Sequence, residues 1–303
     1  EMMVYNKDVI DANAAAITAA LGEPFPTDRA LTWAELDLLT PILVDPNWNP
    51  ASPTADKCEV LVNFDSPANF FINNVRMWQG GYTNSDGDIL VDNANTKSML
   101  TYVNTRFTDK TFALPLFYED SQGYGSTHFI AGDVCMSVGS TAGINYNIPT
   151  DGSFEVGVVP VPQYDLAHKS AVQQGPNISI LSKSTDAQRL VAWEFIKYLI
   201  TSENTAAWAM DTGYLPVRKT GFNSTEYQEF LAIDSITNKK YYSSLAAQAA
   251  LLQKDYYEYD PAFAGAYTSS DARDKADVAM EALFAGNSVQ AVIDDMLSQL
   301  GVN

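Results

Sequence analysis

The apolar positions of the chain predict one helix more clearly than any other. Leu190, Trp193 and Ile196 recur at helical spacing after Thr185, whose side chain is typical of a helix cap. A second helix is expected to follow over residues 202–211. The same reasoning predicts helices through the C-terminal third of the chain, over residues 225–232, 243–257, 270–285 and 288–300.

Shorter apolar runs predict strands between the helices. Residues 1–8 are β-prone and lead into an alanine-rich helix over 11–21, and a capping box at Thr32 and Glu35 starts another helix. Asp86–Gly87, flanked by strand formers, predicts a hairpin. Further strands are expected over 58–64, 133–139 and 154–162, and a further helix over 93–107. Strands mixed with helices at this spacing favour an α/β fold.

Residues 211–218, Asp-Thr-Gly-Tyr-Leu-Pro-Val-Arg, form a helix exit. Gly213 can adopt the left-handed geometry that closes a helix, and Pro216 cannot continue one. Tyr214 is therefore held at a fixed angle where the chain leaves the helix. From these residues alone, the ring could line a cleft or fill a gap in a core.

The composition is that of a globular, acidic protein. The 303 residues, 46% of them hydrophobic, can bury a large core, and the length suggests one large or two ordinary domains. Thirty-seven acidic against 18 basic residues give a net charge of −19, which repels phosphate backbones, so we expect no nucleic-acid partner. The sequence contains no run of about 18 apolar residues, which is the length that a helix needs to span a bilayer. The sequence does not begin with basic residues followed by a short apolar segment, which is the pattern of a signal peptide. If the protein is exported, we expect that its signal peptide is not in this chain.

The two cysteines give no sign of a metal or redox motif. Cys58 and Cys135 each lie in a strand-like run, and neither belongs to a C-x-x-C pair. Two buried free thiols are the favoured interpretation. A disulfide is the alternative, and it would point to an oxidising compartment.

Residues suited to catalysis are few. His128 and His168, the only histidines, lie outside any known motif, and Gly80–Gly81 lacks the Lys-Ser/Thr pair of a phosphate-binding loop. We therefore predict no enzyme activity, no catalytic residue, no cofactor and no metal site. A glycoside hydrolase stays open as an alternative, because two carboxylates that are distant in sequence can meet in a fold.

Eight short segments follow one another in the order of a known family. The first is Tyr-Asn-Lys-Asp at 5–8 and the last is Thr-Gly-Tyr-Leu-Pro-Val at 212–217. Those between are Thr-Trp-x-Glu-Leu at 32–36, Gly80–Gly81, Phe-x-x-Gly-x-x-x-Met at 129–136, Gly-x-x-Pro-x-Pro at 157–162, Gly-Pro-Asn-Ile-Ser-Ile at 175–180 and Ala-Trp-Glu-Phe-Ile-Lys-Tyr-Leu at 192–199. In this series the chain resembles the extracellular solute-binding proteins of ABC importers, in the group that includes carbohydrate and glycerol-phosphate binders.

The resemblance implies a periplasmic-binding-protein-like α/β fold, in which two lobes enclose a ligand cleft. Family members usually begin with roughly a hundred more residues, enough for most of one lobe. The resemblance therefore implies that the first lobe is incomplete in this chain. Residues 1–168 and 222–303 are expected to form lobe two, and residues 169–221 to return to lobe one.

The resemblance also suggests ligand-binding residues. The turn after the strand at 133–139 offers the hydroxyl groups of Ser140 and Thr141, which suit sugar or phosphate oxygens. Gly175 and Asn177 match a turn whose backbone approaches the ligand closely.

Four further positions are candidates for ligand contact. Tyr214 matches a tyrosine of the glycerol-phosphate binders, and Arg273 falls where that group places a phosphate-binding arginine. Arg273 could instead pair with a neighbouring aspartate on a helix surface. Asp65 is a candidate acceptor for sugar hydroxyls, with Phe64 or Phe70 beside it as a stacking surface.

The predicted function is that of a receptor that captures a sugar or oligosaccharide for the permease of an ABC importer. Ala142 and Ser269 stand where maltose-type binders place tryptophans, so long α-glucans are not expected. A glycerol-3-phosphate or glycerophosphodiester ligand is the alternative, and a glycoside hydrolase or a non-transport sugar-binding module is the alternative of another class. The expected place is the extracellular face of a bacterial cytoplasmic membrane or the periplasm, with membrane contact only through a lipid anchor or permease docking.

Overall fold

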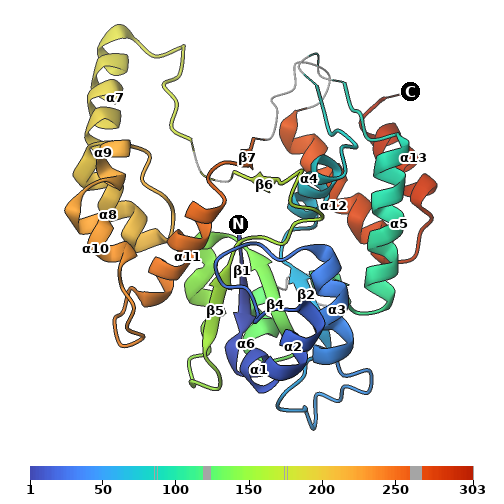
Figure 1. Ribbon diagram of the computed structural model, residues 1–303. Helices are drawn as coiled ribbons and strands as arrows, with labels where there is room; N and C mark the ends of the chain where they lie inside the picture. The colour runs from blue at the N-terminus through green and yellow to red at the C-terminus, as the bar shows by residue number, and fades with distance from the viewer. Residues whose placement is uncertain are drawn as a thin grey trace.

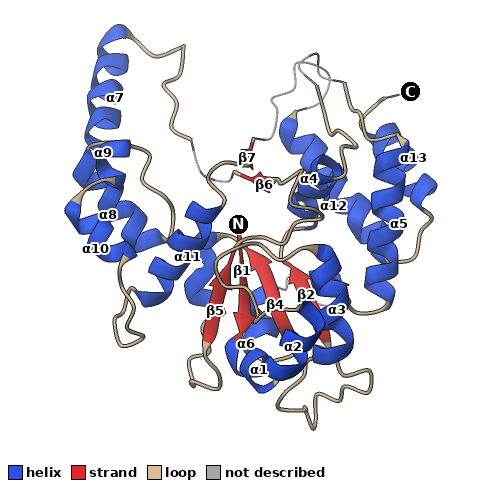
Figure 2. Cartoon of the chain, in the orientation of Figure 1, coloured by secondary structure: helices blue, strands red, loops and turns tan. Residues whose placement is uncertain are grey.

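The protein is built on a mixed five-stranded sheet (Figures 1 and 2). The computed structural model describes residues 1–84, 86, 88–118, 124–173, 175, 177–259 and 268–302. The strands lie in the order β3-β2-β4-β1-β5; β2 is parallel to β3 and β4, and β1 is antiparallel to β4 and β5. Their bounds are Met2–Asn6 (β1), Val60–Phe64 (β2), Phe112–Ala113 (β3), Val134–Gly139 (β4) and Val156–Val159 (β5).

Both faces of the sheet are covered by other elements. The side chains of a strand alternate between the two faces, so a strand can contribute to two apolar clusters. On β1, Met2 and Val4 pack into one apolar cluster, and Met3 and Tyr5 pack into another. The first cluster takes its remaining residues from β5 and from three covering elements: α6 (Gly125–Ile130), the 3-10 helix η2 (Thr141–Asn147) and α11 (Tyr241–Leu252).

The second cluster is the larger core. Trp33 is buried in it and packs against Phe70, Tyr102 and Phe112 with ring centroids 5.1 to 6.1 Å apart. The helices that enclose this cluster are α1 (Lys7–Ala12), α2 (Ala14–Leu21), α3 (Trp33–Leu43), α4 (Pro67–Met77), α5 (Ala94–Thr108), α12 (Ser269–Phe284) and α13 (Val289–Gln299).

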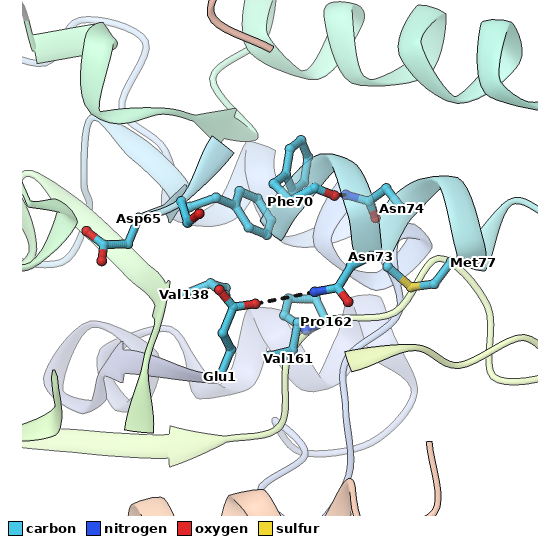
Figure 3. A pocket seen from close by; sticks show the side chains of 11 residues that line it. Glu1, Asp65, Phe70, Asn73, Asn74, Met77, Val138, Val161 and Pro162 are labelled. Atoms are coloured by element: carbon cyan, nitrogen blue, oxygen red, sulfur yellow. Dashed lines mark hydrogen bonds between the residues drawn. The ribbon is translucent and has the colours of Figure 1, made fainter. Parts of the chain in front are cut away.

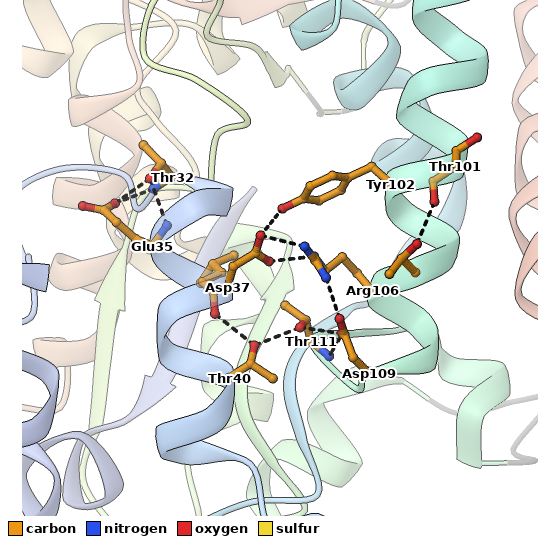
Figure 4. Close-up of polar contacts among 11 residues, drawn as sticks. Thr32, Glu35, Asp37, Thr40, Thr101, Tyr102, Arg106, Asp109 and Thr111 are labelled. Carbon is orange, nitrogen blue, oxygen red and sulfur yellow. Dashed lines mark hydrogen bonds and ion pairs between the residues drawn. The ribbon is translucent and has the colours of Figure 1, made fainter. Parts of the chain in front are cut away.

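A set of polar contacts fastens α5 to α3 (Figure 4). Arg106 pairs with Asp37, with Nε 2.7 Å from Oδ1, and the Tyr102 hydroxyl donates to Asp37 Oδ2 at 2.5 Å. Burial, reinforced by the hydrogen bond to Asp37, raises the pKa of Tyr102 to about 12. The hydroxyls of Thr40 and Thr111 meet at 2.8 Å below this pair. The contacts fix α5 beside the sheet, although partial exposure limits what the ion pair contributes.

A group of helices on the other side of the sheet forms a third apolar cluster (Figure 1). Ala206 and Ala209 of one helix pack there against Tyr227 and Phe230 of another, and Ala247 of α11 joins them to the sheet. The helices of this group are α7 (Asp186–Leu199), α8 (Ser202–Thr212), α9 (Lys219–Phe222) and α10 (Thr225–Leu231). The remaining elements are η1 (Pro115–Tyr118) and the parallel pair β6 (Ala171–Val172) and β7 (Tyr257–Glu258).

Most predicted helices and strands are present, and the differences have local causes. The opening strand ends at Asn6 because the Asn6 side chain accepts the N–H of Val9 at 3.1 Å and so caps α1. The capping box at Thr32 is confirmed. The chain also turns back as predicted, with Thr83 and Ile89 paired antiparallel; Gly87 of that turn lies outside the described residues.

The expectation of two free thiols is wrong, because Cys58 and Cys135 form a disulfide. Cys58 lies just before β2 and Cys135 lies within β4, and these strands are neighbours with Val60 opposite Val134. Their Cα atoms are 5.5 Å apart, within the usual range for a disulfide. Strand order, which the sequence pattern does not reveal, therefore decides the pairing.

Candidate functional site

Polar groups gather where β2 and β4 end. Asp65 follows β2, and its N–H donates to the carbonyl of Val138 in β4 at 2.9 Å. Gly139 ends β4, and a Cβ there would lie 3.6 Å from the Cβ of Asp65, so the two residues are in contact distance. Carboxyl ends of parallel strands are the usual place for ligands in α/β sheets. We call this edge, with the Ser140–Thr141 turn that follows, the rim.

Asp65 is held in a partly buried position on the rim. Its Oδ1 accepts the N–H of Gly125, the first residue of α6, at 2.8 Å. Burial raises the pKa of the Asp65 carboxyl, and this hydrogen bond partly opposes the rise. Glycine is needed at position 125, because a Cβ there would lie 2.6 Å from the side-chain nitrogen of Asn63 and collide with it. The carboxylate thus has one oxygen fixed by the backbone, and its Oδ2 lies toward Gly139.

The exit of α8 rests on the turn that follows β4. Gly213 ends α8 with φ of 78°, and a Cβ there would lie 2.6 Å from the carbonyl oxygen of Thr141. Only glycine fits, because a side chain would occupy a left-handed position and collide with backbone. Ser140 Oγ accepts the N–H of Ala142 at 3.3 Å and caps the same turn. Tyr214, which is half-buried, directly follows the glycine that contacts this turn.

A chain of polar contacts runs from Glu1 through α4 to α12, and Figure 3 shows the contact between Glu1 and Asn73. Glu1 is buried, and its carboxylate accepts from the amides of Asn69 and Asn73 at 2.7 and 3.3 Å. Asn69 Oδ1 in turn accepts from Arg273 at 2.5 Å. The neutral amide of Asn69 thus lies between an acid and a guanidinium group.

Sequence reasoning missed Glu1, Asn69 and Asn73. A usable signal was present, because Asn69 and Asn73 stand four residues apart in the run that forms α4 and so share one face of the helix. Nothing in the sequence pattern, however, showed that β1 would bring Glu1 to that face.

The cavity beneath the rim is too small for a solute. It has about 10 Å³ of free space, which is scarcely room for one water molecule. Glu1, Asp65, Phe70 and Asn73 are among the residues that line it (Figure 3). A small-molecule solute therefore does not fit in this cavity.

The structure places the other predicted residues less close to the rim. Phe70 has 3% of its surface exposed and packs against Phe64 at 4.1 Å, so it forms part of the core beside Asp65. Gly175 and Asn177 are exposed between β6 and α7, with open space where a Cβ of Gly175 would be. The ligand roles of these residues stay predictions.

A larger groove lies elsewhere. It has about 490 Å³ and runs between strand β5 and helix α11, where Tyr5, Lys7 and Tyr241 are among its lining residues. None of the predicted binding residues lines it. Among the described residues, no group of three or more His, Cys, Asp or Glu side chains could hold a metal ion, and no helix is long and apolar enough to cross a membrane.

Similarity to known proteins extends over most of the chain. Residues 1–233 match the family model of bacterial extracellular solute-binding proteins. Over 106 residues the chain is 30% identical to the sn-glycerol-3-phosphate-binding periplasmic protein UgpB of Escherichia coli (strain K12), a match that covers 34% of this chain and 24% of that protein. The match thus spans about a quarter of the length of that curated relative.

Solved structures show the same fold along nearly the whole chain. UgpB from Mycobacterium tuberculosis, in complex with glycerophosphocholine, superposes with a TM-score of 0.66 at 19% identity, covering 99% of this chain and 67% of that one. The sugar-binding protein MalE from Xanthomonas citri gives a TM-score of 0.68 at 14% identity, again covering 99% and 67%. The predicted α/β fold of the periplasmic-binding-protein type is confirmed.

Proposed function

Since the chain belongs to the bacterial extracellular solute-binding protein family, we propose that it is the substrate-binding receptor of an ABC importer and captures a carbohydrate at the rim. The observation that carries this proposal is the contact between Gly213 and Thr141. It brings the backbone just before Tyr214 to the turn of Ser140 and Thr141, so we propose that the Tyr214 ring and the hydroxyls of this turn contact the solute together. Hydroxyl groups can both donate to and accept from sugar hydroxyls, and an aromatic ring offers an apolar face.

Charge favours a neutral solute. The carboxylates of Glu1 and Asp65 line the cavity beneath the rim, and the whole chain carries −19. Both would repel an anionic ligand. A carboxylate such as Asp65 can instead accept a hydrogen bond from a sugar hydroxyl.

A glycerol-3-phosphate or glycerophosphodiester ligand is the second candidate. It is supported by the sequence likeness to UgpB and by Arg273, whose guanidinium group donates to Asn69 of α4. Arg273→Gln separates the two candidates. It should weaken binding of glycerol phosphate by roughly tenfold or more, because a hydrogen bond to a charged group contributes about 1.5 to 3 kcal/mol. Binding of a neutral sugar should change little.

We further propose that residues 169–221 belong to a first lobe and that residues 1–168 and 222–303 form the second. The exposed helix α7 supports this division. The two lobes would be in contact across the boundary at residue 221, since Ala206 and Ala209 of α8 pack against Tyr227 of α10. A solute held between two lobes would favour their closed arrangement, because only the closed form contacts it from both sides.

The proposal includes export and excludes catalysis. The disulfide is typical of an oxidising compartment such as the periplasm or the cell surface, and attachment there would be through a lipid anchor or the permease. The function requires no chemical step, so no residue is assigned a catalytic role.

Thermal unfolding with a panel of neutral sugars, polyols, glycerol-3-phosphate and glycerophosphodiesters tests the function. Ligands that bind only the folded protein raise its unfolding temperature. We expect stabilisation by a sugar or polyol without conversion of it. Hydrolysis of a glycoside that is lost when a single carboxylate is replaced would instead support a glycoside hydrolase, and stabilisation by no member of the panel would contradict both ligand classes.

A further inference from the structure

The groove of about 490 Å³ between β5 and α11 lies apart from the rim. Figure 1 shows α11 beside β5, which is an edge strand of the sheet. β1 runs away from the rim, because Met2 pairs with Gly139 there, and Tyr5 of the groove stands three residues further along the strand. Tyr5 is therefore about 10 Å from the rim. We call this second site the α11 groove.

One face of α11 forms a wall of the groove. Side chains spaced four, three and four residues apart share this face, and they are Tyr241, Leu245, Gln248 and Leu252. None of these four is buried, whereas the opposite side of the helix is buried in the protein. The Gln248 side-chain nitrogen donates to the carbonyl of Leu231 at 2.9 Å, and no described residue donates to its Oε1. The wall is thus mostly apolar and contains one available hydrogen-bond acceptor.

The sheet contributes an aromatic ring to the groove. Tyr5 of β1 is paired with Gly157 of β5, and a Cβ at position 157 would lie 2.0 Å from Cζ of Tyr5 and 2.3 Å from its hydroxyl oxygen. Only glycine therefore leaves room for the end of this ring. Phe25 packs against the ring with centroids 4.8 Å apart. Burial raises the pKa of Tyr5 to about 12, so its hydroxyl is neutral at physiological pH.

The charged residues of the groove leave it with an excess of negative charge. Lys7 is its one cation, and Asp28 and Glu155 are its two carboxylates. Lys7 donates to Asp11, outside the groove, at 2.7 Å, and its Nζ is 3.9 Å from Glu155. The side chain of Asp28 makes no ion pair or hydrogen bond with another described residue. The groove can therefore accept one further positive charge.

We propose that the α11 groove binds a small organic cation with an apolar body, of the arylalkylamine class. The ammonium group would lie at Asp28 and Glu155, and the apolar body would lie against the leucines of α11. The volume of the groove is within the range of small-molecule sites. The net charge of −19 attracts a cation to the protein as a whole.

Two other classes of small molecule fit the groove less well. An anion of the same shape would be repelled by Asp28 and Glu155. A sugar would place hydroxyl groups against Leu245 and Leu252, whose side chains offer no hydrogen bond. The proposal holds whichever solute binds at the rim, because none of the predicted solute-binding residues lines the groove.

Three indole compounds of similar shape and different charge test the proposal. They are the cation tryptamine, the neutral alcohol tryptophol and the anion indole-3-propionate. Ligand-observed NMR titrations of the purified protein give their dissociation constants. We expect tryptamine to bind roughly tenfold more tightly than tryptophol, because each of two exposed carboxylates contributes a factor of about two to five in affinity. Indole-3-propionate should bind more weakly than tryptophol.

A paired set of charge removals locates the cation. Asp28→Asn combined with Glu155→Gln should abolish the preference for tryptamine over tryptophol. Glu226→Gln combined with Glu229→Gln is the matched control, since it removes two exposed carboxylates from α10, outside the groove. The preference should remain in this control.

A second pair of variants tests the apolar wall without removing a carboxylate. Leu252→Lys adds a cation to the wall and should weaken tryptamine binding by roughly tenfold or more. Leu38→Lys on α3 is the control, because Leu38 is 48% exposed, close to the 47% of Leu252, and does not line the groove. It should leave tryptamine binding unchanged.

Four results would overturn the proposal. Equal affinities of tryptamine and tryptophol, or binding of neither, would show that the groove is not a site for organic cations. A preference lost equally in the α10 control would assign the attraction to the net charge of the protein. Full tryptamine affinity in both groove variants would place the amine elsewhere on the protein.

Discussion

Replacing Gly213 by alanine tests the contact on which the candidate site depends. Gly213 has φ of 78°, and Gly22, which ends α2, has φ of 79°. The two glycines play the same role at the end of a helix, but their surroundings differ. A Cβ at Gly213 would lie 2.6 Å from the carbonyl oxygen of Thr141, whereas nothing lies within 4 Å of a Cβ at Gly22. Gly22→Ala is therefore a matched control for backbone strain.

The two variants should differ by the cost of the collision. The left-handed position costs an alanine about 1 to 2 kcal/mol at either site, and the loss of freedom in the unfolded chain is the same for both. Gly213→Ala carries an additional cost of about 1 to 3 kcal/mol, because an inserted methyl group must displace fixed backbone. Displacement of the turn should also weaken solute binding, since Tyr214 and Thr141 move apart.

Urea unfolding followed by far-ultraviolet circular dichroism gives the free energy of unfolding of each variant. We expect Gly213→Ala to lose more stability than Gly22→Ala and, unlike Gly22→Ala, to lose affinity for the solute. Equal losses of stability with unchanged affinity would refute the reasoning, because α8 would then not rest on the Thr141 turn.

Two further predictions follow from the disulfide and from Asp65. Replacing Cys58 and Cys135 together by serine should lower the free energy of unfolding by about 4 kcal/mol, since the bridge closes a loop of 77 residues. The midpoint of urea unfolding measures this loss. A wild-type midpoint that is the same with and without reductant would contradict the prediction. Because burial raises the pKa of Asp65 above its usual 3.8, the folded state binds more protons than the unfolded chain between the two values, and stability falls as pH rises through that window. Asp65→Asn should flatten this fall, and an unchanged slope would disprove the assignment.

Local rules predicted the elements where the signal itself was local. The capping box at Thr32 and the glycine that closes α8 set helix ends through neighbouring atoms, and both are where the sequence places them. The apolar spacing of α7 was also recognised. Its consequence was not, because Trp193, which such spacing assigns to a core, is 48% exposed. Periodicity shows which face is apolar, and it does not show what covers that face.

The candidate site needed the order of the strands. Glu1 reaches Asn69 only because β1 lies in the sheet beside β4, whose neighbour β2 leads into α4. The pairing of Cys58 with Cys135 depends on the same order. Spacing along the chain carries no such information, so the sequence could propose Tyr214 and Ser140 as binding residues only through a resemblance to a family.

The affinity of Tyr214→Ala, measured by titration calorimetry with the solute that most stabilises the wild-type protein, tests the central claim most directly. Tyr241→Ala is the control, since Tyr241 is also a half-buried tyrosine at a helix end but lines the other groove. We predict at least a roughly tenfold loss of affinity for Tyr214→Ala, about 1.4 kcal/mol, with an almost unchanged unfolding temperature, and wild-type affinity for Tyr241→Ala. Wild-type affinity together with lowered stability in Tyr214→Ala would contradict the account. It would show that the Tyr214 ring packs in the core and does not contact the solute.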